Sequence, residues 1–207
     1  MLKDKNLIAS VLNFKQLEQA IEFKENLKCV FILFGNISNL KDIVQLLNDA
    51  NIPSYVHIEY ISGLKVDDYA FKFLKNNIKV KGIITTKSGH IKRAHKENLE
   101  VVQRSFIVDT RMLKLTLRGL DSNKPDYLEI MPALVSNLIP EMKKHTGIPI
   151  ITGGLVNDEY VYEKAIENGA DAVSTSNIKM WKYISKDRKS TRLNSSHRLE
   201  SRMPSSA

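Results

Sequence analysis

The sequence predicts an α/β protein, a small TIM-type (β/α)₈ barrel with parallel strands. Short apolar runs alternate with amphipathic segments through residues 1–184, and strict alternation of this kind requires a parallel sheet with helices outside it. The alternation repeats eight times at about 23 residues per unit, which indicates a closed barrel of less than the usual size. Hydrophobic residues make up 43% of the chain and charged residues 26%, an ordinary globular composition. A doubly wound open sheet is the alternative.

Strands are expected at the short apolar runs. Residues 29–34 (CVFILF) show this most clearly, because a continuously apolar run is typical of a strand that is covered on both faces. The run GIIT at 82–85 and the run PIIT at 149–152 are of the same kind. In chain order the predicted strands are 7–10, 29–34, 54–59, 82–85, 100–104, 127–130, 149–152 and 172–174.

Helices are expected where apolar residues recur three and four positions apart. After Gly35 breaks the second strand, Ser38 or Asn39 can cap a helix. Its inward positions are Leu40, Ile43, Val44 and Leu47. The other predicted helices are 14–27, one from Asp67 through Leu74, 88–98, 109–120, 136–145 and 158–168, with a final turn at 178–184. Gly169 closes the helix before it, as glycine does at many helix ends.

The last part of the chain has a different composition. Residues 187–207 contain four arginines, as many as the preceding 186 residues, together with six serines and no apolar periodicity. Such a segment cannot bury a face and is expected to be disordered. We therefore assign residues 1–185 to a single barrel and residues 186–207 to a tail that resembles translated cloning or adapter sequence. A basic nucleic-acid arm is the alternative.

Charge and cysteine content limit the function classes. The net charge of +8 permits nucleic-acid binding without establishing it. One cysteine, Cys29, excludes a disulfide framework and multi-cysteine zinc patterns, and it fits a reducing compartment. No run approaches about 18 apolar residues, so we expect no transmembrane span, no membrane partner and a cytoplasmic location.

Two segments near the end of the predicted barrel indicate phosphate binding. The run ITGGL at 151–155 puts Gly153 and Gly154 just past a strand, where backbone amides can approach an anion without a Cβ in the way. The run ADAVSTSN at 170–177 supplies hydroxyl groups opposite them. Loops after strands seven and eight often bind phosphate in this fold. The alternative is that the glycines form only a turn and the hydroxyls only cap a helix. The predicted phosphate ligands are Gly153, Gly154, Ser174, Thr175 and Ser176.

Other polar residues are expected at the same end of the barrel. His57 and Glu59 are two apart, so they lie on one face of a predicted strand and suit acid–base work, a hydroxyl or a metal. Glu129 is a third potential ligand, which leaves a divalent ion open but falls short of a defined metal site. Lys87 suits a phosphate or a polyol, and Arg104 suits a carboxylate such as Glu129 or an anionic ligand. Each of these residues also has a purely structural interpretation.

The predicted outer surface carries one basic stripe. Arg111, Lys114 and Arg118 recur at i, i+3 and i+7 on the predicted helix at 109–120. Lys92, Arg93 and Lys96 cluster on the helix before it. The two groups together would suit a phosphate backbone, although a solvated basic face is the more common meaning.

Several segments together resemble the glycerol uptake operon antiterminator family. The similarity runs through residues 1–184 in order and at consistent spacing. The segments are VHIEYISGL (56–64), GIITTKSGHIKRA (82–94), VVQRSFIVDT (101–110), PDYLEIMPAL (125–134), IPIITGGLV (148–156) and AVSTSNIKMWK (172–182). Glu59 stands where an aspartate is expected, and Ala133 follows Pro132 where glycine is expected.

The resemblance implies a small regulatory barrel without catalytic turnover, catalytic residues, metal or cofactor. Its effector would be glycerol 3-phosphate. With effector bound, it would bind the leader mRNA of glycerol-utilisation genes and prevent premature termination, either alone or as a homodimer. By position, the effector pocket would comprise the phosphate ligands above together with His57, Glu59, Lys87, Arg104 and Glu129.

An enzyme is the alternative function. The same pocket would suit a barrel enzyme that acts on a phosphosugar or a glycerophosphodiester with His57, Glu59 and Glu129, with or without a divalent metal, because fold does not fix function. A degenerate barrel that serves only as an interaction scaffold is a third alternative.

Overall fold

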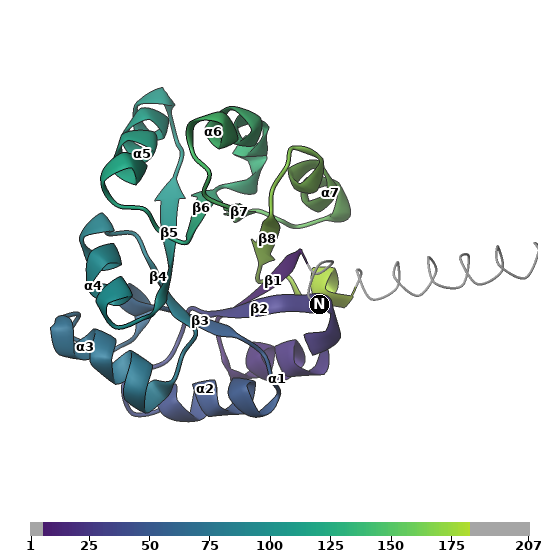
Figure 1. Ribbon diagram of the computed structural model, residues 1–207. Helices are drawn as coiled ribbons and strands as arrows, with labels where there is room; N and C mark the ends of the chain where they lie inside the picture. Colours follow the sequence, from purple (N-terminus) through teal and green to yellow (C-terminus); the bar gives the residue numbers. More distant parts are fainter. Residues whose placement is uncertain (1–5, 183–207) are drawn as a thin grey trace, which may run out of the picture.

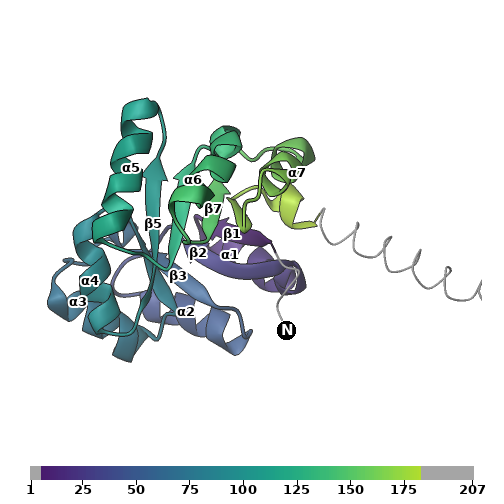
Figure 2. The same ribbon diagram turned by 45° about the horizontal axis from the view of Figure 1, so that its top comes forward.

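The computed structural model describes residues 6–182 and confirms the predicted barrel. Eight parallel strands lie in chain order around one closed barrel, and pairing of the last strand with the first completes it. The helices lie around the outside, as Figures 1 and 2 show from two directions. The strands are β1 (Leu7–Val11), β2 (Leu27–Ile32), β3 (Ser54–His57), β4 (Gly82–Thr85), β5 (Glu100–Phe106), β6 (Tyr127–Met131), β7 (Ile150–Gly153) and β8 (Ala172–Thr175).

Each α-helix returns the chain along the outside of the barrel. The helices are α1 (Phe14–Glu22), α2 (Leu40–Asp49), α3 (Asp68–Phe73), α4 (Ile91–Lys96), α5 (Thr110–Ser122), α6 (Ile139–His145) and α7 (Glu159–Glu167). Several begin at a side-chain oxygen that accepts a first-turn N–H, which satisfies a donor that the helix cannot pair internally. These caps are Asn13, Asp67, Asp109 and Asp158. Residues 178–182 are also helical.

Two apolar layers hold the barrel together. The inner layer fills the barrel and includes Phe31 and Tyr55, whose rings meet edge to face. The outer layer packs the other strand faces against the helices, with Leu40, Ile43, Val44 and Leu47 of α2 all buried as their spacing predicts. Helix α5 packs more loosely than α2, because only Thr116 and Leu120 of its 13 residues are buried. Most of its surface therefore faces solvent.

The structure corrects some predicted boundaries. The predicted strand 54–59 ends at His57, where its pairing with β4 stops and the 3₁₀ turn η2 (Ile58–Tyr60) begins. The predicted helix 14–27 ends at Glu22, and Leu27 belongs to β2 because it pairs with β1. The predicted tail at 186–207 lies outside the described residues.

Candidate functional site

A pocket opens where β5, β6, β7 and β8 end. Its volume is about 180 Å³, and its lining includes Arg104 from β5, Gly154 after β7, and Ser174, Thr175 and Ser176 from β8 and the residue after it. Ends of parallel barrel strands are where this fold places its binding sites. Four of the five predicted phosphate ligands therefore meet Arg104 in one hollow.

Arg104, which lines this pocket, belongs to a buried ion pair. Arg104 is 5% exposed and Glu129 is fully buried, and Arg104 Nε donates to Glu129 Oε2 at 2.6 Å. Ser174 Oγ donates to the other carboxylate oxygen, also at 2.6 Å. Both oxygens of Glu129 are thus bonded, whereas the two Nη groups of Arg104 have no partner among residues 6–182. Arg104 can therefore offer two further charge-assisted donors to an anion.

The two glycines differ in position. Gly153 is the last residue of β7 and pairs with Ser174, and a Cβ built on it would lie only 2.0 Å from Ser174 Oγ. Close packing of β7 on β8 therefore requires glycine there. Gly154 has φ +74°, a left-handed conformation that disfavours other residues, and it lines the pocket. Its carbonyl oxygen accepts the N–H of Ala133 at 3.0 Å.

The hydroxyl groups of β8 are mostly engaged. Ser174 bonds Glu129, while Thr175 Oγ1 donates to the carbonyl of Val156 at 3.1 Å and accepts the N–H of Asn177 at 3.0 Å. Ser176 is exposed. Sequence reasoning treated these three hydroxyls as equivalent, but only that of Ser176 is left without a protein partner in the part of the chain that the structure describes.

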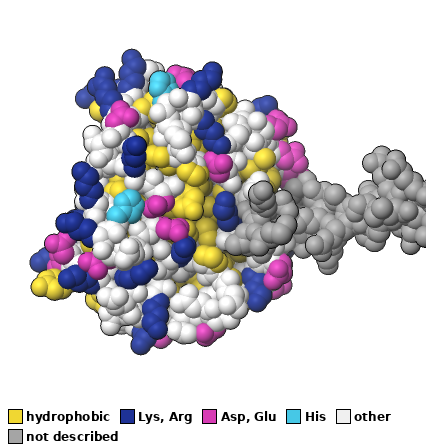
Figure 3. Space-filling model, in the orientation of Figure 1, with side chains coloured by type: hydrophobic (Ala, Val, Ile, Leu, Met, Phe, Trp, Pro, Cys, Tyr) yellow, Lys and Arg dark blue, Asp and Glu magenta, His cyan; other side chains and the backbone are white. Residues whose placement is uncertain are grey.

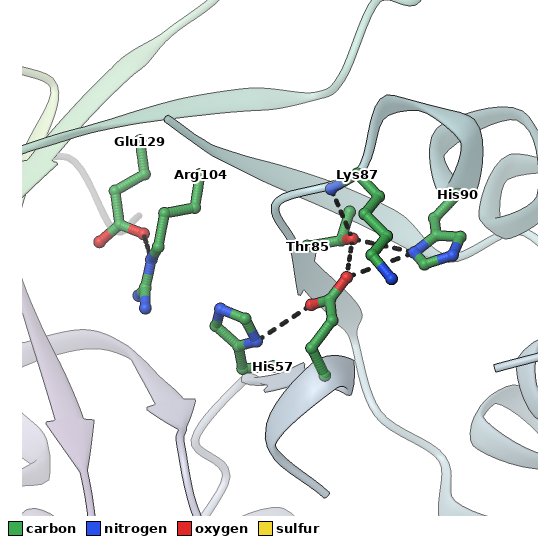
Figure 4. Close-up of polar contacts among 7 residues, drawn as sticks. His57, Thr85, Lys87, His90, Arg104 and Glu129 are labelled. Carbon is green, nitrogen blue, oxygen red and sulfur yellow. Dashed lines mark hydrogen bonds and ion pairs between the residues drawn. The ribbon is translucent and has the colours of Figure 1, made fainter. Parts of the chain in front are cut away.

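A second polar cluster lies at the ends of β3 and β4. His57 Nδ1 is 3.1 Å from Glu59 Oε2, and His90 Nδ1 is 3.4 Å from Glu59 Oε1. The Thr85 hydroxyl donates to Glu59 and lies 3.0 Å from His90 Nδ1. Figure 4 shows the His57 ring between this cluster and the Arg104–Glu129 pair. The predicted His57–Glu59 contact is present, but Glu59 reaches it from η2 rather than from the strand.

The position of His57 is unusual for a buried polar ring. It is 1% exposed and stacks on Tyr60 with ring centroids 4.0 Å apart. Its Nε2 is buried and has no hydrogen-bond partner anywhere in residues 6–182, and its Nδ1, although 3.1 Å from Glu59 Oε2, also lacks hydrogen-bond geometry. An unpaired buried donor or acceptor costs about 1–3 kcal/mol. The ring nitrogen is therefore placed to gain from a bound polar group.

Burial and hydrogen bonding shift two of these groups. Burial alone would raise the pKa of Glu59, but its polar contacts with His57 and Thr85 outweigh burial and lower the pKa. Burial lowers the pKa of His90, partly opposed by the nearby Glu59 carboxylate. Both shifts favour an ionised Glu59 beside a neutral His90.

Sequence reasoning missed Thr85 and His90. Thr85 ends β4, and His90 ends the 3₁₀ turn η4 (Ser88–His90) that follows it. Their signal was their place at the end of a strand and in the turn that follows it, the region already used for Lys87. Lys87 itself contributes its backbone N–H, which donates to Thr85 Oγ1 at 3.1 Å. Within residues 6–182 no three His, Cys, Asp or Glu side chains are arranged to hold a metal ion.

The predicted basic surface is divided between two helices. On α4, Arg93 Nε bonds Asp68 Oδ1 at 2.6 Å, and its guanidinium lies 4.9 Å from the Phe71 ring centroid. The remaining predicted RNA ligands are exposed and make no ion pair with any described residue. They are Lys92 and Lys96 on α4 and Arg111, Lys114 and Arg118 on α5. No helix of the described chain is both long and apolar enough to cross a membrane.

Comparison with known proteins decides the family. The model of the glycerol-3-phosphate responsive antiterminator family matches residues 7–181. The chain belongs to this family. The uncharacterized protein YgcP of Escherichia coli (strain K12) is 31% identical over 183 residues, which cover 87% of this chain and 94% of YgcP.

Two solved structures of antiterminator or antiterminator-related proteins are also similar to this chain. The glycerol uptake operon antiterminator regulatory protein of Listeria monocytogenes matches with a TM-score of 0.81 and 28% identity, over 86% of this chain and 96% of that one. A glycerol uptake operon antiterminator-related protein of Thermotoga maritima matches with a TM-score of 0.75 and 26% identity, over 86% and 98% of the two chains. The resemblance found in the sequence is thus confirmed.

Proposed function

We propose that this chain is an antiterminator that binds glycerol 3-phosphate in the pocket beside Arg104 and, when loaded, binds the leader mRNA of glycerol-utilisation genes. The family supports the regulatory role, and the observation that carries the effector site is the buried Arg104. Glu129 uses only its Nε, which leaves two donors for a phosphate at the edge of the pocket.

The pocket suits an anion that also carries hydroxyl groups. The phosphate lies between Arg104 and the backbone of Gly154, with the free hydroxyl of Ser176 beside it. The glycerol part extends toward His57, whose Nε2 then gains the partner that it lacks. The Glu59 carboxylate lies 3.1 Å from the other ring nitrogen, Nδ1. One small ligand thus connects the two polar clusters that Figure 4 shows apart.

Effector binding can control RNA binding only if the effector binds the RNA-competent conformation more tightly than the other conformation. A ligand shifts a conformational equilibrium by its difference in affinity for the two states and by nothing else. The regulator therefore binds glycerol 3-phosphate more tightly in its RNA-competent form. By reciprocity, the leader RNA raises the affinity for glycerol 3-phosphate by the same factor.

The test is binding of the leader transcript of the glycerol uptake operon, with and without glycerol 3-phosphate, over a range of salt. Effector-dependent binding with a strong salt dependence supports the proposal. Equal RNA binding in both conditions would overturn the effector role. Turnover of a phosphosugar or a glycerophosphodiester, followed by product analysis over hours, would instead establish the enzyme alternative.

A further inference from the structure

A large hollow lies at the opposite end of the barrel, between α5 and α6. It has a volume of about 770 Å³ and is bounded by the second half of α5, by the segment that leads into β6, and by the segment from the end of α6 to β7. These segments meet where strands begin, far along α5 from its start near the effector pocket. Figure 3 shows Lys and Arg side chains over α5 and α6, as well as along the edge formed by α3 and α4.

The cations of this groove are available to a ligand. Lys114 and Arg118 of α5 and Lys124 after it line the groove, and none forms an ion pair with a described residue. Lys114 and Arg118 also border a second hollow on the outer side of α5, together with Arg111. The α4 cluster offers fewer unpaired cations, because Arg93 forms an ion pair with Asp68. Of the two predicted basic clusters, the one on α5 therefore keeps all of its cations free of described partners, whereas the one on α4 keeps only Lys92 and Lys96.

The floor of the groove is suited to planar rings. Pro125, Pro149 and Leu117 line it, and the His145 side chain is exposed at its edge. Unpaired RNA bases stack on aromatic rings, which His145 supplies here, while the phosphates meet cations alongside. The cations that line the groove come from α5 and the segment after it, so the groove matches an anionic partner better than an apolar protein segment.

One acidic side chain of the groove can distinguish between bases, because it accepts hydrogen bonds from the amino groups that only some bases carry. Asp121 lies in the last turn of α5, is exposed and has no bonded partner in the described chain. The other carboxylate of the groove, Asp126, is used by His95 Nε2 at 2.9 Å and by the N–H of Val101 at 2.8 Å. A free carboxylate among cations opposes phosphate binding but accepts hydrogen bonds from base amino groups.

We propose that the α5–α6 groove is the RNA-reading site, with phosphates on Lys114, Arg118 and Lys124 and an unpaired base held in the groove by Asp121. This inference rests on the proposed function, since it concerns the surface on which that RNA lies. It assigns RNA contact to the α5 half of the predicted basic patch and not to the α4 half.

The experiment compares two charge reversals of equal size and spacing. In the presence of saturating glycerol 3-phosphate, Lys114→Glu with Arg118→Glu should weaken leader-transcript binding at least about tenfold. It should also make the fall of log affinity with log salt shallower by about 1.4, because each lost phosphate contact on single-stranded RNA contributes about 0.7 to its slope. The matched control, Lys92→Glu with Lys96→Glu on α4, should change binding less than about twofold. Equal effects of the two pairs would overturn the inference.

Asp121→Asn distinguishes a reading site from a basic patch. If Asp121 holds a base, the variant binds the leader about tenfold more weakly and a scrambled transcript of equal length at least as well as before. If the groove is only electrostatic, both transcripts bind more tightly, and the inference fails. Absence of any leader binding by the unmodified chain with effector would instead refute the proposed function itself.

Discussion

Replacing Gly153 by alanine tests how the pocket beside Arg104 is built. The new Cβ would lie 2.0 Å from Ser174 Oγ, 3.0 Å from the Ser174 carbonyl oxygen and 3.2 Å from Glu129 Oε1. Ser174 must therefore turn away from Glu129. Overpacking a core costs about 1–3 kcal/mol, and losing a hydrogen bond to a charged group costs about 1.5–3 kcal/mol. We expect Gly153→Ala to lower the free energy of unfolding by about 3–5 kcal/mol.

A double-mutant cycle makes this expectation specific. Ser174→Ala alone loses the bond to Glu129 and should cost about 2 kcal/mol. With Ser174→Ala already in place, Gly153→Ala no longer meets the hydroxyl oxygen, so the double variant should be at least about 1 kcal/mol more stable than additivity predicts. Urea unfolding followed by the fluorescence of Trp181, the single tryptophan and fully buried, measures all four proteins. Additive effects would show that Ser174 does not set the need for glycine.

Three further predictions concern the site, its pH response and the end of the chain. Gly154→Val places a branched side chain at φ +74° and should abolish the thermal stabilisation by glycerol 3-phosphate; unchanged stabilisation in a thermal-shift assay would move the phosphate elsewhere. The lowered pKa of His90 means that the unfolded chain binds its proton more readily, so stability should fall as the pH drops below about 6.5. His90→Gln should flatten that part of the stability curve, and equal slopes in the two proteins would contradict this assignment. Ending the chain at Lys186 should leave effector and RNA binding intact, whereas loss of RNA binding would show that residues 187–207 contribute.

The sequence predicts the barrel well because its signals are local. Apolar runs, helical spacing and turn residues each depend on a few neighbouring positions, and eight repeats of one pattern permit few topologies. Boundaries depend on pairing instead. Strand β5 continues through Phe106, two residues beyond the predicted end at Arg104, because Ser105 and Phe106 pair with β6 although Phe106 is half-exposed. The apolar pattern of β5 thus ends before its hydrogen-bonded pairing with β6 ends.

The site is harder to predict because its contacts depend on register across the barrel. Position after a strand correctly indicated which end of the barrel His57, Lys87 and Arg104 occupy. It did not show that they divide into two clusters, or that Thr85 and His90 complete one of them. Glu59 reaches His57 only because η2 turns the chain back, an arrangement that alternation along a strand does not contain.

The link between Glu129 and Ser174 shows what register adds. Glu129 lies on β6 and Ser174 on β8, so β7 stands between them in the barrel. Their hydrogen bond passes the position where a side chain of β7 would lie, and that position is Gly153. Because Gly153 has no side chain, the side chains of the two neighbouring strands can meet across β7. Their contact fixes the carboxylate that orients Arg104. Gly153 therefore affects the pocket through packing. Gly154, the next residue, lines the pocket itself.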